Sequence, residues 1–219
     1  MQLHRTGKRP QWAGLSRKRR NAWQRVAART DGVLTVGNFF TLFGFGLVLA
    51  GLGYVIAAGR SGSDGREEWY IIGFGLIVVG RLCDLLDGWL AELTGTKSPL
   101  GESLDAGFDK LITLLALPAL VVATILPWWA AGALALPHVF IAAISARLIR
   151  LRRVPHPSLT GKLSMAAAWL TVSTAVLAVA LAQEWSYAAY IGWLAYAAGS
   201  LSVVLGAQAA IGYARQLRK

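Results

Sequence analysis

Residues 84–109, DLLDGWLAELTGTKSPLGESLDAGFD, concentrate acidic side chains in an otherwise very apolar sequence. The chain of 219 residues has 55% hydrophobic and only 15% charged residues, whereas a soluble domain usually has about 25% charged residues. Only eleven residues in all are Asp or Glu. Six of these eleven lie in this stretch: Asp84, Asp87, Glu92, Glu102, Asp105 and Asp109. The composition excludes an ordinary soluble enzyme, a disordered chain and a disulfide scaffold, since Cys83 is the single cysteine.

On both sides of this stretch the sequence predicts membrane-spanning helices. About 20 apolar residues are enough to cross a hydrocarbon core of about 30 Å. Residues 111–146 contain no charge but are too long for one crossing, so Pro127-Trp128-Trp129 is the predicted turn. Residues 94–103 contain glycine and proline and are expected to break the helix. The expected spans are 34–58, 69–93, 105 to the turn, the turn to about 147, 163–183 and 185–214.

The predicted fold class is therefore all-α, a polytopic membrane protein with six transmembrane helices. Residues 1–33 form a basic juxtamembrane segment, and residues 34–219 form the membrane domain. An interfacial helix with Trp12, Leu15, Trp23 and Val26 on one face is one interpretation of the basic segment, and a solvated tail is the other. The net charge of +11 then points to anionic lipid, and no nucleic-acid partner is expected.

The basic residues also predict the orientation. The N-terminal tail, the 147–162 loop and the C-terminal end carry most of the Lys and Arg and would all lie on one side. Short loops rich in Lys and Arg stay in the cytoplasm. We expect a multi-pass protein of the cell (inner) membrane, with both termini and the acidic stretch facing the cytoplasm.

The four aspartates of the acidic stretch are candidate metal ligands. Spacings of three and four place Asp84 with Asp87, and Asp105 with Asp109, each on one helical face, and a short connection makes the two helices neighbours. An Asp at the centre of a membrane helix costs about 2.5–3.5 kcal/mol, so four need cations. A role in binding divalent metals explains the four aspartates better than a role as ordinary juxtamembrane charges does. Gly88 would let another group approach the helix backbone.

The motif Asp84-x-x-Asp87-Gly88-x-x-Ala91, followed by Gly101-x-x-x-Asp105-x-x-x-Asp109, resembles the signature of the CDP-alcohol phosphatidyltransferases. The spacing matches throughout, and Glu92 stands where the family has arginine. In the first span Asn38, Thr41 and Gly44 resemble the family's PNxxTxxG opening, with Gly37 where proline is usual. Asp109-Lys110 and Gly161-Lys162 are similar to the phosphatidylglycerophosphate synthase and cardiolipin synthase branches.

The resemblance implies an enzyme that transfers a phosphatidyl group from CDP-diacylglycerol to a hydroxyl acceptor, releases CMP and works as a homodimer. Glycerol 3-phosphate and phosphatidylglycerol are the favoured acceptors, and inositol phosphate, which also presents a hydroxyl near a phosphate, stays open. Two divalent ions, Mg²⁺ or Mn²⁺, would be held by Asp84, Asp87, Asp105 and Asp109, and Asp109 would also be the catalytic base. The implied donor contacts are Asn38, Thr41, Gly88, Ala91 and Gly101.

Several of these roles have alternatives from the sequence alone. Asn38 and Thr41 would serve equally well in hydrogen bonds between helices. The basic residues Arg147, Arg150 and Lys162 are candidates for binding an acceptor phosphate, since guanidinium groups make bidentate contacts, but positive-inside topology also explains them. At the level of function, an aspartate-rich membrane prenyltransferase and a divalent-cation transporter would use similar carboxylates.

Overall fold

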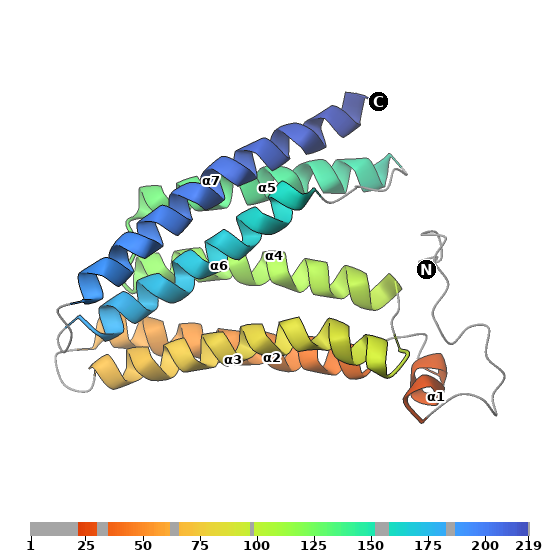
Figure 1. The fold of residues 1–219 in the computed structure, drawn as a ribbon, viewed down its shortest axis with the longest axis horizontal. Helices are drawn as coiled ribbons and strands as arrows, with labels where there is room; N and C mark the ends of the chain where they lie inside the picture. Colours follow the sequence, from red (N-terminus) through yellow and green to blue (C-terminus); the bar gives the residue numbers. More distant parts are fainter. Residues whose placement is uncertain are drawn as a thin grey trace. The chain divides into compact units, whose positions relative to one another are not determined.

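The structure, a computed structural model, describes residues 22–29, 35–61, 66–96, 99–151, 158–182 and 187–218; of residues 99–106 it describes the helix but not the side chains. The described chain is entirely helical apart from its turns (Figure 1). In order along the chain, the helices are α1 (Ala22–Arg29), α2 (Val36–Arg60), α3 (Arg66–Leu93), α4 (Pro99–Val122), α5 (Trp128–Arg150), α6 (Leu159–Ala180) and α7 (Ala188–Arg218).

The prediction of an all-α membrane protein is confirmed. Within the described ranges, five helices are long and apolar enough to cross a membrane, namely α2, α3, α5, α6 and α7. The sixth long helix, α4, has 24 residues and carries Glu102, Asp105, Asp109 and Lys110 in its first half. The chain is therefore a multi-pass membrane protein, and half of its acidic motif lies on α4.

The predicted break over residues 94–103 is wrong at its C-terminal end, because α4 already begins at Pro99 and includes Gly101. Proline suits the first position of a helix, where its missing N–H has no partner to lose. The turn instead depends on Gly95, which has φ 65°. The N–H groups of Gly95 and Thr96 donate to the carbonyls of Glu92 and Ala91, at 3.1 and 2.9 Å, which ends α3 in a Schellman motif.

The predicted turn at Pro127 is confirmed. Helix α4 ends at Val122 and α5 begins at Trp128, directly after Pro127. Trp128 and Trp129 have exposed fractions of 77% and 61%. Exposed tryptophans at a helix end are typical of the membrane–water interface.

The chain divides into two compact units. The first unit comprises residues 1–50 and 76–112, and the second comprises residues 51–75 and 113–219. The acidic motif falls wholly within the first unit. The boundary passes through α2, α3 and α4, so each of these helices contributes one end to each unit.

In the second unit, small polar residues join α6 to α7, which lie side by side (Figure 1). The Ser164 hydroxyl donates to the Ser202 carbonyl at 2.8 Å, and the Ser202 hydroxyl donates to the Ser164 carbonyl at 2.9 Å. In the same unit the Thr113 hydroxyl of α4 donates to the Met165 sulfur of α6 at 3.2 Å. Such hydrogen bonds are a usual means of association between helices in lipid, where apolar side chains gain little from contact.

In the first unit, glycines bring α2 and α3 into backbone contact. A Cβ atom added to Gly44 would lie 2.6 Å from the Gly80 carbonyl oxygen, and one added to Gly80 would lie 2.7 Å from the Gly44 carbonyl oxygen. The same pattern recurs one repeat away, at Gly37, seven residues before Gly44, and at Asp87, seven residues after Gly80. A Cβ atom added to Gly37 would lie 3.2 Å from the carbonyl oxygen of Asp87. The two helices therefore run antiparallel in one register with a seven-residue repeat.

Helix α1 packs in the first unit against the turn that follows α3. The Gln24 side chain donates to the Gly95 carbonyl at 3.3 Å, and Ala27 is fully buried. Trp12 and Leu15 lie outside the described residues, as do the side chains of Trp23 and Val26. The interfacial role of residues 1–33 therefore stays a prediction.

The glycine contact predicts different effects for two alanine substitutions on α2. Gly44→Ala would force a methyl group against the Gly80 carbonyl and should cost about 1–3 kcal/mol of stability, as overpacking does. Gly46→Ala is the matched control, because a Cβ there meets no atom within 4 Å and should change stability by no more than about 1 kcal/mol. Thermal unfolding of both purified variants in detergent measures the difference. Equal unfolding temperatures would contradict the proposed contact.

Candidate functional site

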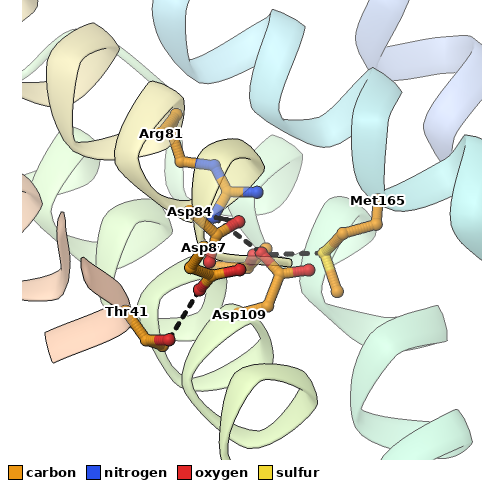
Figure 2. A network of polar contacts seen from close by, with 7 residues as sticks. Thr41, Arg81, Asp84, Asp87, Asp109 and Met165 are labelled. Atoms are coloured by element: carbon orange, nitrogen blue, oxygen red, sulfur yellow. Dashed lines mark hydrogen bonds and ion pairs between the residues drawn. The ribbon is translucent and has the colours of Figure 1, made fainter. Parts of the chain in front are cut away.

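The C-terminal half of α3 and the first turns of α4 carry the acidic motif. Helix α3 supplies Arg81, Asp84 and Asp87, and α4 supplies Asp109 from across the hairpin (Figure 2). Asp105 lies in α4 one turn before Asp109, but its side chain is outside the described part of the chain. Three of the four predicted ligands can therefore be examined in detail, and all three lie in the first unit.

One guanidinium nitrogen connects the two helices at the site. Nη1 of Arg81 lies 3.0 Å from Oδ2 of Asp84 and 2.8 Å from Oδ1 of Asp109. The three side chains are 24%, 21% and 25% exposed, so water screens the two ion pairs only in part. This one residue therefore contacts two of the four motif aspartates. The carboxylates of Asp84 and Asp109 thus face one common point of positive charge.

Asp87 is held by a different partner, on α2. It is buried, with an exposed fraction of 5%, and its Oδ2 accepts a hydrogen bond of 2.5 Å from the Thr41 hydroxyl (Figure 2). Thr41 is equally buried and also lies 3.1 Å from the Gly37 carbonyl. Thr41 is expected from the sequence either to contact the lipid donor or to form a hydrogen bond between helices, and the structure contains the hydrogen bond between helices. This bond fixes the orientation of a carboxylate beside the ion pairs of Arg81.

The start of α2 brings a second polar residue into the interior. The side chain of Thr35 accepts a hydrogen bond of 3.0 Å from the Asn38 N–H and so caps the helix. Asn38 itself is 8% exposed. Nearby, Phe45 of α2 and Phe108 of α4 pack with ring centroids 4.8 Å apart. The cap begins α2, and the aromatic pair packs α2 against α4 within the first unit.

The predicted donor-binding glycine and alanine differ in their surroundings. A Cβ atom on Gly88 would meet no atom within 4 Å, so this part of α3 has an open face. The Cβ of Ala91, by contrast, lies 3.1 Å from a Cβ built on Gly37, so Ala91 contacts α2. Gly107 of α4, between Asp105 and Asp109, has the same open surroundings as Gly88. Gly107 is not a fixed position of the motif, and its place between two motif aspartates is the one sequence signal for this open surface.

The predicted acceptor-binding residues lie in the second unit. Arg147 and Arg150 are exposed in the last turns of α5, and Lys162 is exposed in the first turn of α6. The Ser158 hydroxyl caps α6 by accepting from the Gly161 N–H at 3.1 Å. Basic groups at the end of α5 also interact favourably with the helix dipole. Their part in binding an acceptor stays a prediction.

The carboxylate oxygens at the site are of the type that binds a divalent cation. Carboxylate oxygens are the ligands that Mg²⁺ prefers, and Asp84 and Asp109 already converge on one positive group. Among the residues with described side chains, no three acidic, histidine or cysteine groups are close enough to hold a metal ion. Asp105 is not among those residues. The role of the four aspartates as metal ligands therefore stays a prediction.

The sequence model of the CDP-alcohol phosphatidyltransferase family matches residues 34–204, from the start of the first membrane span into α7. The chain therefore belongs to this family, whose members transfer a phosphatidyl group from a CDP-alcohol and generally depend on divalent metals. No curated protein matches the chain significantly.

The hydrogen bond from Thr41 to Asp87 predicts a loss of stability when the hydroxyl is removed. Thr41→Val keeps the shape of the side chain but leaves a buried carboxylate without this donor, which should cost about 1–3 kcal/mol. Thr41→Ser keeps the hydroxyl and should lose less. Thermal unfolding of the two variants beside the unchanged protein measures the effect, and the hydrogen bond has no such role if valine and serine behave alike.

Proposed function

We propose that the chain, as a CDP-alcohol phosphatidyltransferase, transfers phosphatidyl from CDP-diacylglycerol to the hydroxyl of glycerol 3-phosphate or phosphatidylglycerol and releases CMP. The observation that carries this proposal is the convergence of Asp84 and Asp109 on one cation across the α3–α4 hairpin. These residues belong to a motif with the family's spacing, and the family match covers the helices that carry them.

In the proposed site, Asp84, Asp87, Asp105 and Asp109 hold two divalent ions. When bound, Mg²⁺ or Mn²⁺ would stabilise the negative charge on the diphosphate of CDP-diacylglycerol and on the attacking and leaving-group oxygens. The chain orients its own carboxylates for this task, since Thr41 holds Asp87 and the α3–α4 hairpin brings Asp84 to Asp109. The open face of α3 at Gly88 leaves room for the donor beside Asp87.

Asp109 is the proposed general base. Its carboxylate accepts the proton of the acceptor hydroxyl as the hydroxyl oxygen bonds to the lipid-linked phosphorus of the donor. The bond between that phosphorus and the bridging oxygen of the diphosphate breaks, and the electron pair leaves on CMP. A carboxylate in this role must reach the hydroxyl while it stays ionised, and Asp109, with a 25% exposed side chain, is more accessible than the buried Asp87.

The proposed acceptor carries a phosphate as well as a hydroxyl. Arg147, Arg150 and Lys162 are the candidates to bind that phosphate, and their exposure at the ends of α5 and α6 supports this role. Asp109-Lys110 and Gly161-Lys162 support the phosphatidylglycerophosphate synthase and cardiolipin synthase branches. The loops rich in Lys and Arg support a cytoplasmic site in the inner membrane, and resemblance to the family supports a homodimer.

Asp109→Asn tests the general base. The variant should release CMP at least about 10²-fold more slowly, because the amide accepts no proton from the acceptor. Glu68→Gln, an exposed carboxylate in the first turn of α3, is the matched control and should keep full activity. CMP release from CDP-diacylglycerol is measured with each acceptor, the lipid product is identified by its mass, and size-exclusion chromatography checks folding. Full activity in a folded Asp109→Asn protein would remove Asp109 from this role.

Metal removal tests the cofactor. EDTA should abolish CMP release, and added Mg²⁺ or Mn²⁺ should restore it, because the carboxylates alone cannot neutralise the diphosphate of the donor. The measurement is the rate of CMP release during a titration of each ion after dialysis. Turnover that continues at the same rate in excess chelator would rule out the proposed use of the four aspartates.

A further inference from the structure

We infer that Arg81 is a positioning residue that holds Asp84 and Asp109 together before a divalent cation binds and leaves them when it does. Arg81 is not part of the motif that carries the family resemblance, which begins at Asp84. The inference rests on the proposed function in one respect, namely that these carboxylates bind a divalent cation.

The contact geometry makes the guanidinium and a metal ion competitors. A single nitrogen, Nη1 of Arg81, lies within 3.0 Å of one oxygen from each carboxylate. A divalent ion that takes the same two oxygens would lie at almost the same point, and two positive groups so close together repel strongly where water screens them only in part. Exchange of one cation for the other avoids this repulsion.

The charge balance of the site points the same way. The four motif aspartates contribute four negative charges, which two divalent ions would neutralise without Arg81. Without the ions, Asp84 and Asp109 need another cation, because like charges that converge near a membrane are costly. Arg81 is suited to this part because it lies one turn before Asp84 on α3 and reaches across to Asp109 on α4. It therefore keeps the hairpin assembled until the metal arrives.

Metal affinity provides a readout that does not depend on turnover. Mn²⁺ binding to the purified full chain in detergent is measured by calorimetry or by electron paramagnetic resonance. Arg81→Gln should bind Mn²⁺ about threefold to tenfold more tightly than the unchanged protein, because the competing ion pairs are gone. Arg81→Lys keeps the charge but not the planar fork, and should show a smaller gain of about twofold. Arg215→Gln, an exposed arginine on α7, removes the same charge elsewhere and should bind as before.

Thermal unfolding distinguishes exchange from a permanent ion pair. In EDTA, Arg81→Gln should unfold roughly 2–4 °C below the unchanged protein, since the two carboxylates lose their cation. At saturating Mn²⁺ this difference should disappear, because the metal then holds the two carboxylates in both proteins and Arg81 of the unchanged protein no longer contacts them. The Arg215→Gln control should show no dependence on the metal.

The possible results separate the inference from the proposed function. Suppose that the unchanged protein binds Mn²⁺. The exchange is then overturned, and the metal site stands, if Arg81→Gln binds Mn²⁺ equally or more weakly. The same conclusion follows if the unfolding temperature of Arg81→Gln is lower by the same amount with and without Mn²⁺. If the unchanged protein binds no Mn²⁺, both fall. Should Arg81→Gln fail to fold, Arg81→Lys decides alone: unchanged affinity together with a metal-independent loss of stability overturns the inference.

Discussion

The backbone contact between Gly44 and Gly80 is the constraint on which the acidic site depends. Two helices approach this closely only where neither has a side chain, and the contact fixes both their separation and their register. The seven-residue repeat then sets Gly37 against Asp87, and Thr41 reaches the carboxylate of Asp87 one turn further along α2. A packing interaction thus determines which polar groups meet. The alignment of α2 and α3 is part of how the site is built.

The second constraint is electrostatic. Carboxylates on membrane-spanning helices need partners, and the first unit provides two kinds. Thr41 donates a hydrogen bond to the buried Asp87, whereas Arg81 contacts the more exposed Asp84 and Asp109. The buried carboxylate is held by a neutral donor on α2, and the more accessible pair is held by a cation on a long side chain. In the proposed exchange, the first contact would stay in place and the second would be replaced by the metal.

Much of the fold could be predicted from the sequence. Long uncharged segments indicated the helices, and Pro127 with its tryptophans indicated the turn between α4 and α5. The break between α3 and α4 is shorter than residues 94–103, because proline and glycine have different effects at helix ends. Pro99 instead begins α4, and only Gly95 has the left-handed backbone that ends α3. The candidate ligands Asp84, Asp87 and Asp109 were also identified from their spacing, although the hairpin alone did not reveal their individual partners.

That the chain is a helical membrane protein of the CDP-alcohol phosphatidyltransferase family follows from its sequence, since composition, span length and motif spacing are local properties of the chain. The contacts of Thr41 with Asp87 and of Arg81 with Asp84 and Asp109, by contrast, depend on the tertiary structure. Thr41 and Asp87 are 46 positions apart, and their contact depends on how each helix is rotated about its axis. Helix α2 is apolar on nearly every side, so its hydrophobic pattern favours no single rotation. In the structure the rotation is the one that brings Gly44 against Gly80, although α2 also carries Gly46 and Gly53 on a face that meets no atom within 4 Å. The choice between the two glycine faces is therefore made by tertiary packing.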